Sequence, residues 1–219
     1  WEPRDVVGGD IYWNRVWGDG VLIILADCTG HGVPGAFMTL ISTGALERAL
    51  EEIPTGAVGK LIQRLHQLVQ MSLSQHVGEG ESDDGLELGA VYLEPELTTL
   101  TFSGARFELF SVDGETVTVT KGTKKGIGYR NIPFGQAYEE IQVPIHPGCS
   151  FYLTTDGLTD QVGGERRLMF GKKRLKNLLL EINELPMAEQ RERILQALSK
   201  HQGTETRRDD VSVIGFKVS

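Results

Sequence analysis

The sequence predicts an α+β domain in which antiparallel strands are flanked by pairs of helices. Short segments with alternating polar and apolar residues dominate the ends and the middle of the chain, and this alternation is typical of half-buried strands. Apolar residues at helical spacing fall into two pairs of longer segments. The spacing of the strands suits an antiparallel sandwich better than a parallel sheet.

Seven segments are predicted to form strands. They are residues 21–26, 88–93, 98–103, 107–112, 116–120, 150–154 and 211–218. Asp113 and Gly114 separate the fourth of these segments from the fifth and form a two-residue turn signal. We therefore expect these two strands to form a hairpin.

Four helices are predicted, in two pairs. The first begins at Pro34, a residue that the first turn of a helix tolerates, and continues to about Ala49. After a break at 54–56, apolar residues at helical spacing predict a second helix of roughly five turns. Near the end of the chain, residues 175–182 predict a third helix, and a fourth follows Pro186.

Composition limits the functions that the chain can have. Its 219 residues suffice for one sizeable domain, and we treat 1–219 as a single domain that belongs to a longer protein. The formal charge of -8 argues against nucleic-acid binding, and no apolar run approaches the roughly 18 to 20 residues of a membrane helix. With only two cysteines, Cys28 and Cys149, there is no disulfide framework, so a reducing, cytoplasmic compartment is expected.

Carboxylates stand beside glycines at the ends of apolar segments in four places. These carboxylates belong to Asp10, Asp27, Asp156 and the pair Asp209–Asp210. A buried carboxylate without a partner is costly, so a shared cation is one interpretation, and turn or cap aspartates are the other. Oxygen donors suit Mg²⁺ or Mn²⁺, and two such ions about 3.5 to 4 Å apart would activate a water for attack on phosphorus. The first interpretation predicts a two-metal hydrolase.

Four motifs in the same order resemble bacterial PP2C-type phosphatases of the sporulation protein E class. They are residues 8–12 (GGDIY), 26–36 (ADCTGHGVPGA), 152–160 (YLTTDGLTD) and 208–213 (RDDVSV). Residues 170–175 also fit the segment that follows the third motif in this family. The resemblance extends from about residue 3 to the end of the chain. It implies a four-layer α-β-β-α sandwich with two central, mainly antiparallel sheets.

The resemblance also implies an activity and a set of ligands. The activity is that of a protein serine/threonine phosphatase with two Mn²⁺ or Mg²⁺ ions and room for a third. Asp27 resembles the bridging carboxylate, the carbonyl of Cys28 a backbone ligand, and Asp10 a carboxylate that faces the second metal through water. Asp156 and Asp209 would hold the first metal, and Asp10, Asp27 and Asp156 are the expected catalytic residues. Asp210 matches a less constant position, for which a cap or turn role is the alternative.

The chain departs from the wider family at several positions. Eukaryotic relatives have a general-acid His where this chain has Thr29. His31 lies two residues further on; it is either a proton donor to the leaving oxygen or a residue that orders the loop. Arg4 is the candidate for binding the substrate phosphate, with a solvated surface arginine as the alternative. No mechanism follows for Arg106.

Two further features of the sequence leave alternatives open. The acidic segment 78–87 is interpreted as a solvated loop, and its Asp83 or Asp84 is the candidate ligand of a third metal. Cys28 is not expected to act as a nucleophile, because no histidine is placed to activate it.

The resemblance implies a phosphorylated regulatory protein, of the anti-sigma-antagonist type, as substrate and partner. A catalytically silent domain that binds a phosphoprotein is the alternative, although Asp27, Asp156 and Asp209 are all retained. Neither nucleic acid nor direct membrane contact is expected of this domain, and a homodimer is left open. Family members often carry sensory or membrane-anchored segments, so the full protein is expected to place this domain in the cytoplasm.

Overall fold

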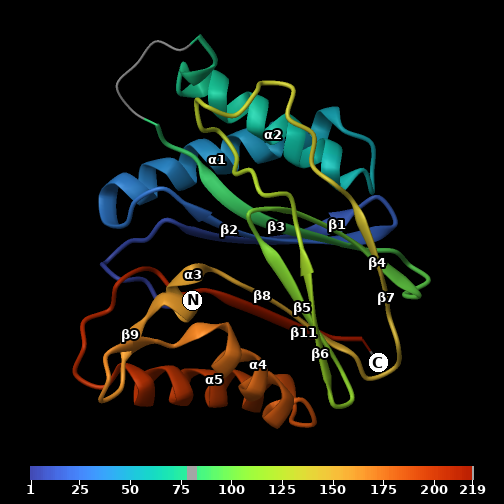
Figure 1. Cartoon of the computed structure of the whole chain (residues 1–219). Helices are drawn as coiled ribbons and strands as arrows, with labels where there is room; N and C mark the ends of the chain where they lie inside the picture. The colour runs from blue at the N-terminus through green and yellow to red at the C-terminus, as the bar shows by residue number, and fades with distance from the viewer. Residues whose placement is uncertain (78–82, 219) are drawn as a thin grey trace.

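The computed structural model describes residues 1–77 and 83–218, and it has four layers. Helices α1 and α2 form one outer layer, two antiparallel sheets form the middle, and α4 and α5 form the other outer layer (Figure 1). The predicted α-β-β-α sandwich is thereby confirmed. Across the described residues, none of the helices combines the length and the apolar composition needed to cross a membrane.

The strands divide into two main sheets and a small ribbon. The first sheet, in the order β1-β2-β3-β4-β7, contains β1 (Asp10–Trp17), β2 (Gly20–Cys28), β3 (Leu86–Leu93), β4 (Thr99–Ala105) and β7 (Ile141–Pro144). The second, in the order β11-β8-β5-β6, contains β5 (Glu108–Asp113), β6 (Thr116–Lys121), β8 (Ser150–Thr154) and β11 (Val213–Lys217). The ribbon pairs β9 (Val162–Gly163) with β10 (Leu168–Met169). Every pairing between these strands is antiparallel.

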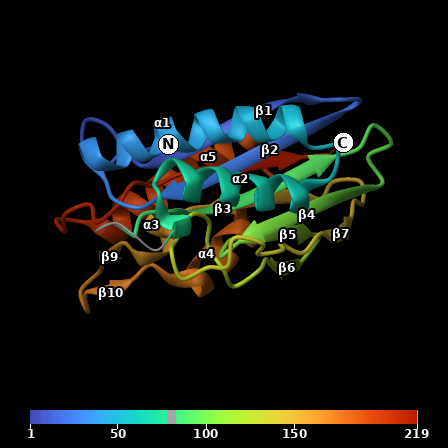
Figure 2. The same ribbon diagram turned by 90° about the horizontal axis from the view of Figure 1, so that it is seen from above.

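The helices lie outside the sheets, apart from one short helix at their edge. They are α1 (Gly32–Glu52), α2 (Val58–Ser72), α3 (Asp156–Asp160), α4 (Gly171–Ile182) and α5 (Met187–Gln202), with a 3-10 turn η1 (Gln75–Val77) after α2. Seen from above, α1 lies over β1 and β2, and α2 lies over β3 and β4 (Figure 2). All four predicted helices are therefore present.

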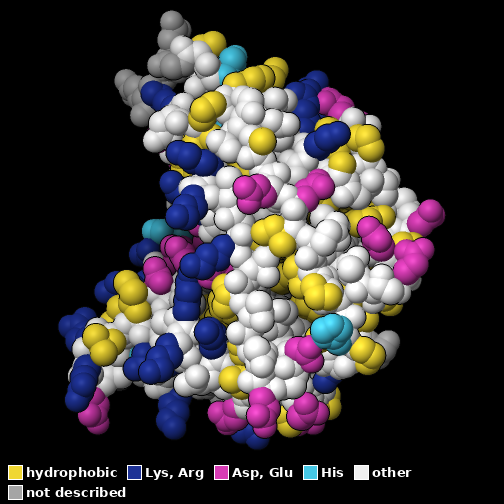
Figure 3. Space-filling view, turned by 45° about the vertical axis from the view of Figure 1, so that its right-hand side comes forward, with side chains coloured by type: hydrophobic (Ala, Val, Ile, Leu, Met, Phe, Trp, Pro, Cys, Tyr) yellow, Lys and Arg dark blue, Asp and Glu magenta, His cyan; other side chains and the backbone are white. Residues whose placement is uncertain are grey.

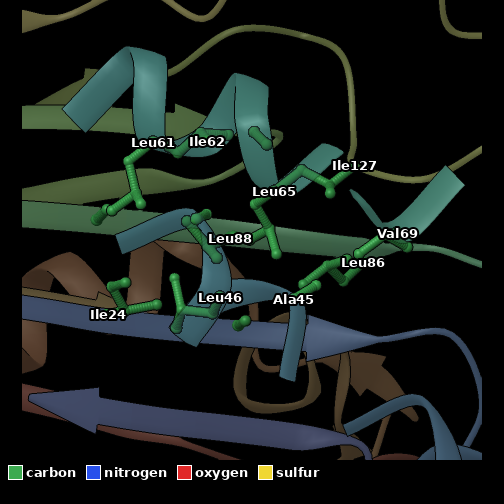
Figure 4. Packing of buried hydrophobic residues seen from close by; sticks show 14 of the residues in the cluster. Ile24, Ala45, Leu46, Leu61, Ile62, Leu65, Val69, Leu86, Leu88 and Ile127 are labelled. Atoms are coloured by element: carbon green, nitrogen blue, oxygen red, sulfur yellow. The ribbon is translucent and has the colours of Figure 1, made fainter. Parts of the chain in front are cut away.

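The predicted hairpin and the core agree with the sequence pattern. The β5–β6 hairpin is confirmed, but its turn is shifted by one residue: Asp113 pairs with Thr116, so the turn residues are Gly114, with a positive φ of 54°, and Glu115. Leu61, Ile62 and Leu65 of α2 are fully buried against the first sheet (Figure 4). Separate apolar clusters fill the space between the two sheets and the space beneath α4 and α5.

The sequence pattern missed strand β1 and misplaced part of the apolar face of α1. β1 is an edge strand with apolar residues on both faces: Trp17 is buried, whereas Tyr12 and Val16 are exposed. This removes the alternation by which a strand is recognised. In α1, Ala45 is buried as expected, but Phe37 is 63% exposed because the buried side of the first turns is formed by Gly35 and Met38 instead.

Candidate metal centre

The carboxylates predicted from the sequence meet at one end of the sandwich, where both sheets contribute. Asp10 at the start of β1 lies opposite Asp27 on β2, and Asp27 lies opposite Glu87 on β3. Asp156 is the first residue of α3, directly after β8, and Asp209 comes shortly before β11. Antiparallel pairing thus brings to one place residues that are up to 199 positions apart (10 to 209) in the sequence.

Asp10 is buried and only half satisfied. Its Oδ2 accepts a hydrogen bond of 3.0 Å from the Thr155 hydroxyl, while its Oδ1 is buried with no hydrogen-bond partner. The pKa of Asp10 is raised to about 7, mainly by burial and to a smaller extent by the carboxylates of Asp210 and Asp209, while hydrogen bonding to Ser212 and Thr155 opposes the shift. An orphaned, buried carboxylate oxygen of this kind is what a cation would satisfy.

Asp27 lies at the centre of the cluster. Burial raises the pKa of its carboxyl to about 9, and the next contributions come from Asp10, Asp156 and Asp209. Burial also raises the pKa of Asp156, with further contributions from Asp160 and Asp209. Like charges held together at low solvent exposure are unfavourable unless a positive charge compensates them. The chemistry of these donors therefore fits a divalent cation that prefers oxygen, such as Mg²⁺ or Mn²⁺.

The glycine-rich loop after β2 approaches Asp10 closely. The Cys28 amide donates a 3.1 Å hydrogen bond to the Gly9 carbonyl. A Cβ on Gly9 would lie 2.5 Å from the Gly30 carbonyl oxygen and 3.0 Å from that of Cys28, so only glycine fits there. The Cys28 carbonyl consequently lies beside Asp10 and Asp27, where the family pattern expects a backbone ligand.

The thiol of Cys28 has no part in this arrangement. Its Sγ points toward the Ser42 hydroxyl of α1, 3.7 Å away. Burial raises the pKa of the thiol to about 12, so it stays protonated at neutral pH. This agrees with the expectation that Cys28 is not a nucleophile.

Asp210 is engaged with the backbone of the N-terminal segment. Its Oδ1 accepts a 2.7 Å hydrogen bond from the Arg4 amide, and its Oδ2 accepts one of 2.6 Å from the Gly9 amide. A side chain on Gly8 would collide with this carboxylate at 2.6 Å. Asp210 therefore anchors the residues that precede Asp10. Asp209 accepts a 2.9 Å hydrogen bond from the Asp210 amide at Oδ1, and its charge adds to the effect of burial in raising the pKa of Asp27 and Asp156.

The other predicted site residues lie at the margin of the centre. The Thr29 hydroxyl donates to the Gly85 carbonyl at 3.0 Å. His31 is exposed, and its Nδ1 donates to Asp5 at 2.8 Å. The Arg4 guanidinium donates to the Arg208 carbonyl at 3.0 Å and does not line the pocket described next.

Asp83 and Asp84 are held by local hydrogen bonds. Asp83 accepts a 2.9 Å bond from the Arg130 amide, and the Asp84 amide donates to Gln75. The remainder of the predicted acidic loop, residues 78–82, lies outside the described residues.

A small pocket of about 70 Å³ adjoins the carboxylates, and it is lined in part by residues for which the sequence predicted no role. Its lining includes Asp27 and Asp156 together with Glu87, Arg106 and Lys172. The Arg106 guanidinium lies 3.4 Å from Glu87 and 5.6 Å from the centre of the Tyr129 ring. Burial raises the pKa of Glu87, and Arg106 opposes this shift.

The second basic residue of the pocket, Lys172, lies in the first turn of α4. Its ammonium lies 2.8 Å from the Glu108 carboxylate. Basic side chains border acidic ones around the hollow at the left-hand edge of Figure 3. The alternation of polar and apolar residues at the start of β3 could have indicated that Glu87 points away from the core, but only the strand pairing places it opposite Asp27.

The four-layer sandwich, with acidic residues of both sheets gathered at one end, defines the architecture of PP2C-type protein phosphatases. The chain belongs to the stage II sporulation protein E (SpoIIE) family, whose model matches residues 18–219. No curated protein sequence matches the chain significantly.

The chain is also similar to solved structures of related phosphatases. The PP2C domain of SiaA from Pseudomonas aeruginosa is 36% identical with a TM-score of 0.90, over 100% of this chain and 84% of that one. The PP2C domain of SpoIIE from Bacillus subtilis, solved with a fragment of its regulatory domain, is 16% identical with a TM-score of 0.73, over 96% of this chain and 58% of that one. RsbX in complex with magnesium is 16% identical with a TM-score of 0.65, over 100% of this chain and 91% of that one.

Proposed function

We propose that this domain is a metal-dependent protein serine/threonine phosphatase. The observation that carries the proposal is the convergence of Asp10, Asp27, Asp156 and Asp209, with one Asp10 oxygen buried and unpartnered. Membership of the SpoIIE family and the fold shared with RsbX, which was solved with magnesium, support the same activity.

The residues that would hold two Mn²⁺ or Mg²⁺ ions are those named from the sequence. Asp27 would bridge them, Asp156 and Asp209 would hold the first, and Asp10 and the Cys28 carbonyl would face the second. Bound there, such ions supply an activated water and charge neutralisation for phosphate ester hydrolysis. Thr155 holds Oδ2 of Asp10 by its 3.0 Å hydrogen bond, so the other carboxylate oxygen, Oδ1, stays available to a cation.

Binding of the substrate phosphate is assigned to the basic side of the pocket. Arg106 and Lys172 line the same pocket as Asp27 and Asp156, whereas Arg4 is bonded to Arg208 outside it. A planar guanidinium can donate two parallel hydrogen bonds to a phosphate, and in the absence of substrate Glu87 holds it in position at 3.4 Å. Arg106 is accordingly a better candidate for this role than Arg4.

A phosphorylated regulatory protein is the proposed substrate and partner. The related structures include one described as part of the bacterial stressosome and one from the cell fate determinant SpoIIE, which are bacterial signalling systems. Val33, Phe37 and Leu40 form an exposed apolar strip on α1, a surface suited to contact with a protein rather than with a small phosphate ester. The domain is further proposed to act in the cytoplasm as one unit of a longer, membrane-anchored protein.

The test is hydrolysis of a phosphothreonine peptide by the purified domain with Mn²⁺ and with EDTA. Activity should require the metal, should disappear in Asp156→Asn, and should persist in Asp19→Asn, the same change at an exposed position of the β1–β2 turn. A folded domain that binds Mn²⁺ but never releases phosphate, even from a phosphorylated protein, would favour the silent phosphoprotein-binding module instead.

A further inference from the structure

A second cluster of metal-ligating side chains lies far from the carboxylate centre. Asp113, His146 and Cys149 each offer one donor atom, and these three atoms lie within 4.8 Å of one another. The β5–β6 turn and the connection from β7 to β8 bring them together near the C terminus, at the end of the sandwich opposite α3 (Figure 1). Cys149 immediately precedes β8 and Asp156 follows it, so a strand rise of about 3.3 Å per residue separates the two by roughly 20 Å.

Two tight turns fix these side chains. Residues 146–149 have the sequence His-Pro-Gly-Cys, the Cys149 amide donates to the His146 carbonyl at 3.0 Å, and Gly148 has a φ of 87°. Proline at the second position and a glycine of positive φ at the third are the features of a type II β-turn, which places its first and last residues side by side. Asp113 stands at the mouth of the β5–β6 turn, where its Oδ2 accepts a hydrogen bond of 2.6 Å from His146 Nδ1.

The three donors differ in a way that selects a particular class of cation. A thiol sulfur, an imidazole nitrogen and one carboxylate oxygen are ligands of zinc and its neighbours among the transition metals, whereas Mg²⁺ and Ca²⁺ take oxygen alone. Asp113 and His146 are exposed and Cys149 is buried beneath them, so an ion could reach the thiol from solvent while a water completes its coordination.

The charges around the cluster are compatible with such an ion. Burial raises the pKa of the Cys149 thiol, and the Asp113 carboxylate adds to this effect. The neighbouring Lys217 acts in the opposite direction, and its ammonium donates to the Asn183 carbonyl at 3.3 Å. Metal binding would release the thiol proton to water and move the imidazole proton from Nδ1 to Nε2, leaving thiolate and carboxylate to neutralise a divalent ion.

We propose that Asp113, His146 and Cys149 form a binding site for one zinc-class transition-metal ion, which ties the β5–β6 hairpin to the start of β8. The site is independent of the proposed phosphatase centre. It differs from that centre in having a sulfur ligand, and this difference provides the test.

Cobalt titration of the whole 219-residue chain tests the proposal, because thiolate-bound Co²⁺ shows an intense charge-transfer band in the near ultraviolet and oxygen-bound Co²⁺ does not. The expected result is a band that saturates at the intensity of one thiolate-bound ion per chain, is reversed by Zn²⁺ and is lost in Cys149→Ser. The band should remain in Cys28→Ser, which removes the other thiol, and in Asp156→Asn, which alters the carboxylate centre. A folded chain without the band, or a band that Cys28→Ser removes, would overturn the proposal.

His146→Ala provides a second variant, because this exposed side chain can be removed without disturbing the core. We expect cobalt affinity to fall about tenfold or more, by analogy with the effect of other changes around metal sites. His76→Ala, at another exposed histidine, should leave the affinity unchanged. Equal cobalt affinity in His146→Ala and the unsubstituted chain would contradict the proposal, while an unaltered phosphatase activity in the same variant would keep the two sites distinct.

Discussion

At the scale of single residues, buried polar side chains differ in whether every polar atom has a partner within the protein. Both ring nitrogens of His66 have one: its Nδ1 accepts from the Gly128 amide at 3.0 Å and its Nε2 donates to the Pro133 carbonyl at 3.1 Å. Asp10 differs, with Oδ1 unpartnered. A fully bonded group stabilises the fold as it stands, whereas an orphaned carboxylate oxygen indicates a ligand.

The pairing of His66 predicts a pH dependence of stability. Burial lowers the pKa of His66 below its usual value of 6.5, although the hydrogen bond to the Pro133 carbonyl opposes this shift. Above pH 6.5 both folded and unfolded states are neutral and the stability is fully present. Below it the unfolded state takes up a proton first, so the contribution of His66 to the free energy of unfolding should fall by up to about 1.4 kcal/mol per pH unit.

Denaturant unfolding between pH 5 and 8 measures this effect. His66→Gln, which can still donate and accept, should flatten the profile below pH 6.5, and the exposed His76→Ala should not. A His66→Gln profile identical in slope to that of the unsubstituted chain would show that another group causes the loss.

The role given to Arg106 predicts a defect in substrate binding. A charge-assisted hydrogen bond contributes about 1.5 to 3 kcal/mol, so Arg106→Ala should lower kcat/KM for a phosphothreonine peptide by about 10- to 100-fold. Steady-state kinetics with saturating Mn²⁺ measures the change, and Arg106→Lys should recover part of it. Lys124→Ala removes an exposed charge nearby and should be neutral. An Arg4→Ala variant that loses more than Arg106→Ala would return the phosphate role to Arg4.

At the scale of elements, α1 is joined to the metal centre through glycines. A Cβ on Gly35 would lie 2.4 Å from the Gly30 carbonyl oxygen and 3.0 Å from Gly9 Cα, so helix, loop and β1 are in direct backbone contact. Gly44, in the same helix, faces open space. A shift of α1 would therefore also move the loop that follows Asp27.

This contact predicts opposite effects for one substitution at two positions. Gly35→Ala should displace the loop, lower the phosphatase activity by about 100-fold and destabilise the fold by about 1 to 3 kcal/mol. Gly44→Ala should leave activity unchanged and stabilise the helix by about 0.5 to 1 kcal/mol. Activity assays and thermal unfolding of the two variants measure these effects, and full activity of Gly35→Ala would disprove the coupling.

Some elements and site residues were predictable from the sequence, and others were not. Buried helices and strands were predictable because their apolar periodicity follows from facing one core, as in α2 and β2. The edge strand β1 was not, because Tyr12 and Val16 face solvent. The aspartates were found because they stand at the ends of apolar segments, within motifs that resemble those of a known family. Glu87 and Lys172 enter the site only through strand pairing and layer packing, which no local pattern records.

At the scale of the whole molecule, the sandwich consists of two sheets whose acidic ends face each other. Asp10 and Asp27 come from the first sheet, and Asp156 and Asp209 from the end of the second. Burial, and then the neighbouring carboxylates, raise the pKa of Asp27. Without a cation, the negative charges of the two sheets therefore repel each other at this end of the sandwich. The opposite end is held by Asp113 and the turn at residues 146–149.

Metal binding should therefore stabilise the whole domain by bridging its sheets. An ion present at 100 times its Kd adds about 2.7 kcal/mol, which for a chain of this size raises Tm by roughly 5 to 11 °C. Thermal unfolding with Mn²⁺ and with EDTA measures the shift. Asp27→Asn should abolish it because this carboxylate faces ligands of both sheets, whereas His146→Ala should retain it. A shift that survives Asp27→Asn would mean that Mn²⁺ binds elsewhere, and the carboxylate cluster would then need another explanation.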